Sequence, residues 1–160
     1  MPFDILTPAH TAISLIAVLL GIGAVARLLG RPLAAWWTSW FIAAAIATSA
    51  TGFLFPFIGV TPAFAVGIVA SLILAVVVVA RFATGLRGWW RTAYTLGLVA
   101  SLYLLVFVTV AQAFAKIPAL RALAPTQAEP PFAVAQGVVL LLFIWLGVRA
   151  LRGRGLRMVA

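Results

Sequence analysis

Five long apolar runs constrain this chain more than any other feature. They cover residues 8–26, 34–55, 62–80, 92–114 and 132–151. Each run is close to the ~20 residues that a helix needs to cross a bilayer. The runs lack the strict alternation of barrel strands, and only a helix satisfies all of its backbone hydrogen bonds within one span. We therefore predict an all-α, polytopic transmembrane helix bundle of about five spans, a single transmembrane domain covering residues 1–160.

Composition agrees with a multi-pass protein of the cell inner (cytoplasmic) membrane. The chain is 66% hydrophobic and 8% charged, and its mean hydropathy is +1.24. The formal charge of +9 suggests nucleic acid in a soluble chain, but here the basic residues flank apolar runs, so we expect no nucleic-acid partner. The N-terminus has no basic residue before the first run, which is unlike a cleaved signal peptide.

Basic residues predict the direction of the spans. Nine of the eleven fall at one end of the predicted bundle, and only Lys116 and Arg121, in the loop 115–131, fall at the other. The positive-inside rule then places the N-terminus outside and the C-terminus in the cytoplasm. The nine are Arg27, Arg31, Arg81, Arg87, Arg91, Arg149, Arg152, Arg154 and Arg157. The loop is therefore outside, and its "IPALRAL" portion, residues 117–123, is expected to form a short surface helix.

Two spans begin alike. "TPAHTAISLIAVLLGIGAVAR", residues 7–27, resembles "TPAFAVGIVASLILAVVVVAR", residues 61–81, and a tryptophan follows nine residues after each. Thr-Pro is typical of a helix start, since threonine caps the first turn and proline tolerates its first position. We interpret this as a parallel two-helix repeat, spans one and two with spans three and four, plus one extra span. The alternative is that all outside-to-inside spans share such ends.

Small residues at four-residue spacing predict where the helices touch, because helices in lipid associate through close contact. The first span carries His10, Ser14, Ala17 and Gly21 on one face. Comparable stripes are Ala43, Ala47 and Thr51 in the second span, and Ala93, Gly97 and Ser101 in the fourth.

Polar residues gather toward the outer end and form the candidate ligand-binding set. Its members are His10, Thr51, Gln112, Gln136, Lys116 and Glu129. We expect a pocket with His10, Gln112 and Gln136 at its floor and Lys116 and Glu129 at its rim, since polar groups in a membrane are costly unless used. The alternative is that these residues bond one another between helices or reach lipid headgroups. His10 titrates near neutrality and can donate to a quinone carbonyl or carry a proton.

The residue types in the sequence exclude several classes of cofactor. The chain has no cysteine, which excludes iron–sulfur clusters and thiolate metal sites, and one histidine cannot form a bis-histidine haem. We predict no catalytic or metal-ligating residue, although Asp4 or Glu129 could orient His10.

The function that this pattern favours is a non-enzymatic accessory protein or subunit of a membrane complex, holding a lipid or quinone in the outer pocket. Its expected partners are membrane lipids and either further copies of itself or other membrane subunits. One alternative is a small transporter or channel with an outward-facing polar cavity. Another is a membrane redox protein or enzyme that uses His10.

Residues 110–147, "VAQAFAKIPALRALAPTQAEPPFAVAQGVVLLLFIWLG", together with "HTAISL" at 10–15, resemble small bacterial multi-span inner-membrane proteins. This resemblance implies a membrane location and no activity. The stretch from His10 through "LLGRPLAAWW" to "SATGF" is also similar to bacterial relatives of b-type membrane cytochromes. Those have a further histidine where this chain has tryptophans, which removes the haem inference.

Overall fold

The described part of the chain folds into six helices. The computed structural model describes the backbone of residues 2–56 and 61–153, and the side chains within those ranges from residue 5 onward. The helices are α1 (Pro2–Leu28), α2 (Trp36–Gly52), α3 (Pro62–Phe82), α4 (Trp90–Lys116), α5 (Pro118–Leu123) and α6 (Pro130–Arg152). No strand occurs in the described ranges. The predicted all-α helix bundle is confirmed.

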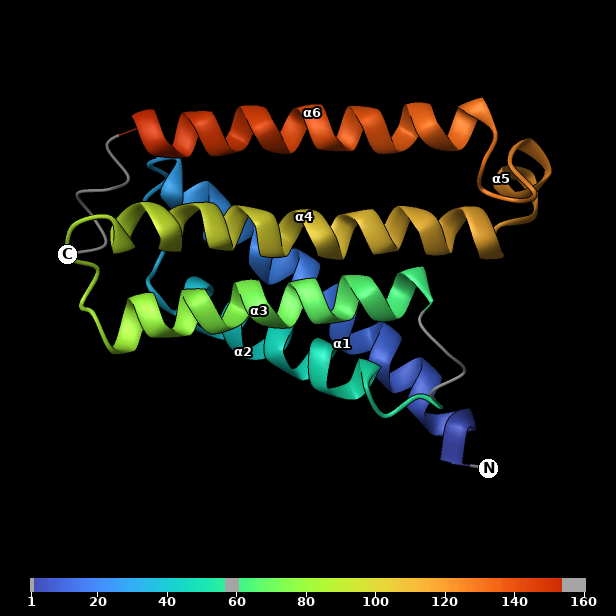
Figure 1. The fold of residues 1–160 in the computed structure, drawn as a ribbon, viewed down its shortest axis with the longest axis horizontal. Helices are drawn as coiled ribbons and strands as arrows, with labels where there is room; N and C mark the ends of the chain where they lie inside the picture. The colour runs from blue at the N-terminus through green and yellow to red at the C-terminus, as the bar shows by residue number, and fades with distance from the viewer. Residues whose placement is uncertain (1, 57–60, 154–160) are drawn as a thin grey trace.

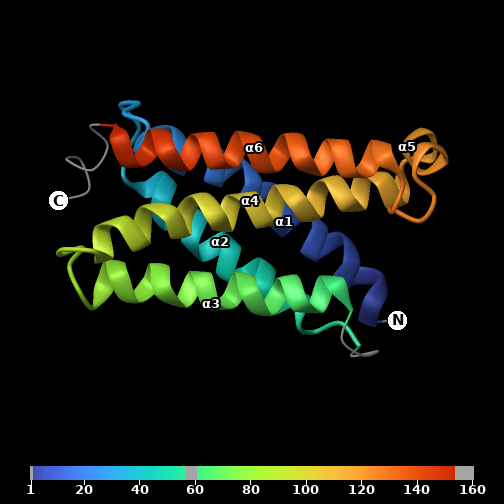
Figure 2. The ribbon, with the colours of Figure 1, turned by 45° about the horizontal axis from the view of Figure 1, so that its top comes forward.

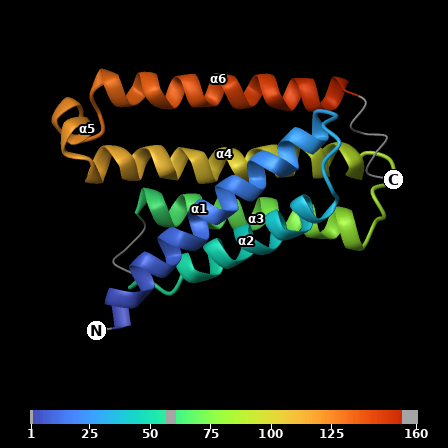
Figure 3. The same cartoon turned by 180° about the vertical axis from the view of Figure 1, so that it is seen from behind.

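The five long helices form two layers. Helices α3, α4 and α6 lie side by side in one layer (Figure 1). Helices α1 and α2 cross behind them at an angle, as the tilted view and the view from behind show (Figures 2 and 3). Consecutive helices pair as hairpins, α1 with α2 and α3 with α4, and α6 packs mainly on α4. Helix α6 therefore lies at the edge of the bundle.

Helix α4 is the centre of the packing, since it contacts α1, α3, α5 and α6. Leu98 of α4 is fully buried, together with Phe41 of α2 and Val77 of α3. Gly97 lets α3 approach, because a Cβ built there lies 2.5 Å from Val77 Cγ2. Gly21 of α1 similarly accommodates Phe41.

Within residues 2–56 and 61–153, four helices are long and apolar enough to cross a membrane: α1 from Ile5, α3, α4 and α6. Helix α2 has 17 residues, the short end of the spanning range, and is about 26 Å long at 1.5 Å per residue. It ends at Gly52, before the end of the expected second run at residue 55. Helix α5 confirms the short helix expected in "IPALRAL", and none of its residues is buried.

The two Thr-Pro pairs differ in structure. Thr61 is the N-cap of α3, where its side chain accepts a hydrogen bond from the Phe64 N–H at 3.2 Å. Pro8 instead lies inside α1, which begins at Pro2, so the expected helix start at Thr7–Pro8 is wrong. Pro8 is the seventh residue of α1, where it removes one backbone hydrogen bond and its ring crowds the carbonyl four residues earlier, while its fixed φ remains helical.

Small-residue stripes predicted the contact face of some helices and not of others. Ala17, Gly21, Gly97 and Ser101 are buried, as expected for α1 and α4. In α2 the expected stripe matches only in part, because Ala43 is exposed whereas Ala47 and Thr51 are half-buried. The buried face of α2 consists of Thr38, Phe41, Ile42 and Ala45. A large aromatic ring, accommodated by Gly21, makes this contact instead of a close backbone approach.

Candidate functional site

His10 and Thr51 join α1 to the end of α2. The Nδ1 atom of His10 lies 2.8 Å from Thr51 Oγ1, and the imidazole meets the edge of the Phe55 ring at a centroid distance of 5.4 Å. Both residues are half-buried. The structure therefore brings together two of the six candidate residues in a direct bond.

The surroundings of Thr51 assign the tautomer of His10. The Thr51 hydroxyl lies 2.8 Å from the Ala47 carbonyl oxygen and 3.1 Å from that of Thr48, both acceptors in its own helix. Because a hydroxyl has one proton and donates it to these carbonyls, it accepts from His10 Nδ1–H. The neutral ring then presents a bare Nε2, which has no hydrogen-bond partner among the described residues.

Phe64 follows Thr61 by three residues, as His10 follows Thr7, and it also contacts the residues at the end of α2. Its ring meets Phe53 edge to face, with centroids 5.7 Å apart. Gly67, one turn further, faces the same ring. The last turn of α2 and the residues after it are thus held from one side by a polar group and from the other by an apolar one.

Lys116 and Gln112 lie on the last two turns of α4, four residues apart on one exposed face. Helix α4 packs against α1, and its last turn lies at the end of the bundle where α1 begins (Figures 1 and 3). His10, Thr51 and Lys116 therefore share one end of the bundle, here called the α5 end. The opposite end, where α1, α3 and α6 finish, is the arginine end.

Gln136 is separated from this group because it faces α4 from α6. Its Nε2 donates to the Phe107 carbonyl at 3.0 Å, and its Oε1 is buried without a partner in the described part of the chain. Gln127, in the loop before α6, donates in the same way to the Ala111 carbonyl at 2.8 Å. The two amides bind successive turns of α4, so Gln136 forms an interhelical bond.

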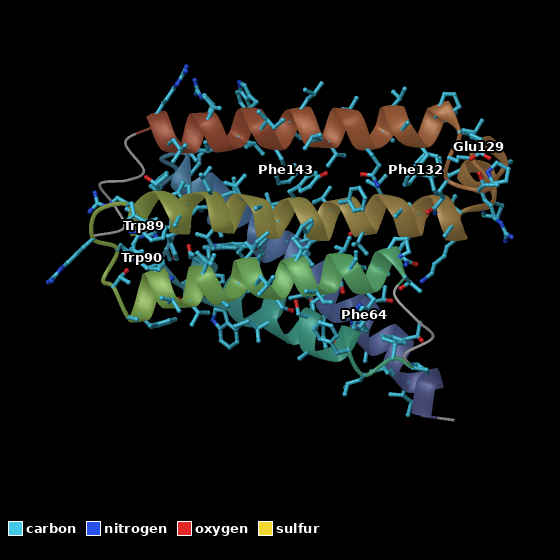
Figure 4. All side chains as sticks on the ribbon, in the orientation of Figure 1. Phe64, Trp89, Trp90, Glu129, Phe132 and Phe143 are labelled. Carbon is cyan, nitrogen blue, oxygen red and sulfur yellow. The ribbon has the colours of Figure 1, made fainter. Side chains whose placement is uncertain are left out.

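Glu129 turns into its own loop, at the α5 end of the bundle (Figure 4). Its carboxylate accepts from the Thr126 hydroxyl at 2.8 Å and from the N–H groups of Thr126 and Ala128. Desolvation raises the pKa of Glu129, but these hydrogen bonds outweigh it, so the pKa lies below its usual 4.5. The other acid, Asp4, lies outside the residues whose side chains are described.

A polar cluster at the arginine end was not expected from the sequence. Arg81 Nη1 donates to the Tyr94 hydroxyl at 2.9 Å, and Nη2 donates to Ser39 Oγ at 2.8 Å. Tyr94 is almost fully buried, at 2% exposure. A buried tyrosine hydroxyl needs a hydrogen-bond partner, so Tyr94 was the residue from which the sequence could have indicated this cluster. The arginine that ends α3 therefore joins α2, α3 and α4.

A groove away from the six candidates lies between α4 and α6. Its volume is about 370 Å³, and ten apolar or aromatic residues line it. They are Leu96, Val99, Ala100 and Tyr103 of α4, and Leu140, Phe143, Ile144, Gly147, Val148 and Leu151 of α6. Figure 4 shows Phe143 between these two helices.

Among the described side chains, no three histidine, cysteine or acidic residues lie close enough together to hold a metal ion. Comparison of the chain with protein-family models, with curated proteins and with solved structures finds no match.

Proposed function

We propose that the chain is a non-enzymatic accessory protein or subunit of an inner-membrane complex, and that it holds the headgroup of a quinone or lipid beside His10. The observation that carries this proposal is the fixed imidazole: Thr51 orients the ring and leaves Nε2 without a partner among the described residues. A polar group that is costly in a membrane and already positioned is a reasonable ligand contact.

The tautomer specifies the chemistry of the ligand. A bare Nε2 accepts a hydrogen bond, so the fitting group is a donor, such as the hydroxyl of a reduced quinol or of a lipid headgroup. An oxidised quinone carbonyl would need a protonated ring. Lys116, in the last turn of α4 at the same end of the bundle, supplies a cation that suits the phosphate of a lipid headgroup.

His10→Phe tests the site, since phenylalanine is the residue at the corresponding position of α3. We expect this variant to lose the quinone or lipid that co-purifies with the native protein in mild detergent, measured by extraction and mass spectrometry. Phe64→Leu is the matched control, because it changes the other contact to the end of α2 without touching the imidazole. Equal ligand retention by wild type and His10→Phe refutes the site.

The subunit role is tested by gentle purification from native membranes. We expect other membrane proteins, or further copies of this chain, to co-purify at fixed stoichiometry. A lone monomer, isolated from cross-linked native membranes, refutes the subunit role and leaves the ligand site to be judged by His10→Phe.

The proposed topology has five spans, with the N-terminus outside and the C-terminus in the cytoplasm. It is supported by the arginines that follow α1, α3 and α6, and by the length of α2. The two hairpins, α1–α2 and α3–α4, support the proposed parallel repeat. Because the chain has no cysteine, single cysteines can be labelled with an impermeant maleimide in intact cells. Leu54→Cys should react from outside and Ala34→Cys only after lysis; the reverse pattern refutes this topology.

A further inference from the structure

We propose that the groove between α4 and α6 is a binding site for one acyl chain of an anionic phospholipid, whose headgroup lies at the arginine end. This site lies outside the candidate set beside His10 and is independent of the proposed ligand there. It requires only that α4 and α6 span a membrane, for which both are long and apolar enough.

The walls of the groove are two facing stripes of side chains. Leu96, Val99 and Tyr103 of α4 follow one another at helical spacing, and Leu140, Ile144, Gly147 and Leu151 of α6 do the same. Gly147 lies on the floor, where a Cβ built on it makes an ordinary van der Waals contact with Leu96 Cδ2 at 3.7 Å. The outer wall residues are open, with Ile144 53% exposed.

The length of the groove matches the thickness of the hydrocarbon in one bilayer leaflet. From Leu140 to Leu151 the helix rises about 16 Å at 1.5 Å per residue, which is about half of the ~30 Å hydrocarbon core. Toward the middle of the bundle, the rings of Tyr103 and Phe143 meet at a centroid distance of 5.7 Å. The Gln136–Phe107 bond joins the helices one turn beyond Tyr103 on α4 and two turns beyond Phe143 on α6. The groove therefore ends near mid-membrane and leads to the arginine end, the geometry that a single lipid tail requires.

The arginines beside the groove favour an anionic lipid headgroup. Arg149 and Arg152 lie in the last turn of α6, and both are exposed. The loop between α1 and α2, which contains Arg31, lies beside this end of α6 (Figures 1 and 3). The two acids of the chain, Asp4 and Glu129, belong to segments at the other end. A phosphate without a compensating ammonium is therefore the complementary group.

The groove wall on α4 also extends to the arginine end, where the lipid headgroup is expected. Thr92 and Trp89 precede Leu96 at spacings of four and seven residues, so they extend the same face of the helix. Trp89 is 64% exposed and stacks on Trp90 (Figure 4). An exposed indole at the end of a span is typical of the membrane interface, and a neighbouring hydroxyl can donate to phosphate.

The test is native mass spectrometry of the full chain, released from mild-detergent micelles that contain equal amounts of phosphatidylglycerol and phosphatidylcholine with identical tails. We expect the wild type to retain phosphatidylglycerol in preference. Gly147→Leu fills the groove and should reduce retention about tenfold, because burial of several methylenes is lost. Arg152→Gln should reduce the preference for phosphatidylglycerol about fivefold, the effect of one arginine near an anionic group.

Leu141→Phe is the matched control, since it adds bulk to an exposed position of α6 outside the groove. Circular dichroism melting checks folding, and Ala100→Phe, from the opposite wall, replaces Gly147→Leu if the latter unfolds. Equal retention of the two lipids by the wild type overturns the proposal, as does unchanged retention by the filled variant. The proposal is also overturned if the groove retains a native quinone, or if a dimer of the chain buries the groove. His10→Phe should leave retention of phosphatidylglycerol unchanged, which separates this site from the one beside His10.

Discussion

His10 Nδ1 lies 2.8 Å from Thr51 Oγ1, and this bond joins residues 41 positions apart at the α5 end of the bundle. It holds the last turn of α2, the shortest of the five long helices, against α1. The same bond fixes the imidazole and leaves its Nε2 without a partner among the described residues. One contact therefore contributes both to packing and to the candidate site.

Thr51→Val removes the acceptor of this bond while keeping the shape of the side chain. We expect a loss of about 0.5–1 kcal/mol in the free energy of unfolding, as for other interhelical hydrogen bonds in membranes, measured in detergent. Thr48→Val is the control, because the Thr48 hydroxyl bonds to the Ala44 carbonyl of its own helix. An equal loss in both variants contradicts the interhelical role.

Gly97→Ala places a methyl group against Val77 where α3 and α4 meet. Overpacking of this kind should cost about 1–3 kcal/mol of stability, seen as a lower melting temperature. Adding Val77→Ala should restore most of the loss, because it removes the clashing methyl. Gly137→Ala, which meets no atom within 4 Å, should be neutral or slightly stabilising. A neutral Gly97→Ala would show that the two helices can separate freely.

Arg81→Ala should destabilise the bundle by about 1–3 kcal/mol, since it leaves the buried Tyr94 hydroxyl without its donor. Ser39→Ala should cost less, because Ser39 is exposed. Arg87→Ala, an exposed arginine of the α3–α4 loop, is the matched control and should change stability by less than about 0.5 kcal/mol. If both arginine variants behave alike, the polar cluster does not stabilise the fold.

Glu129 gives the loop before α6 a pH dependence. A lowered pKa means that the carboxylate stabilises the folded loop above its ordinary pKa of 4.5, and that this contribution is lost as pH falls through the lower folded pKa. Loop order, followed by NMR of the Thr126 amide, should therefore persist at pH 5 and disappear well below pH 4.5. Thr126→Ala should move the midpoint upward, toward 4.5. A midpoint already above 4.5 in the wild type contradicts the observed hydrogen bonds.

The sequence alone determined the class of fold and the number and approximate place of the helices. Runs of about 20 apolar residues leave a backbone no other way to satisfy its hydrogen bonds, so the pattern was sufficient for α1, α3, α4 and α6. Local chemistry was also sufficient where it acts over one turn, as for the Thr61 cap of α3. The identical Thr-Pro at residues 7 and 8 failed as a boundary because a proline near a helix start does not prevent the helix from beginning earlier.

Only the tertiary structure decided which polar groups meet. Composition placed His10, Thr51 and Gln136 toward one end, but their partners depend on how the helices rotate and cross. Helix α4 separates Gln136 from His10, since the amide bonds α4 from α6 and the imidazole bonds α2 from α1. The groove between α4 and α6 likewise arises from the packing of two helices. Apolar residues facing lipid and apolar residues facing a neighbouring helix are chemically alike, so no single-helix pattern distinguishes them.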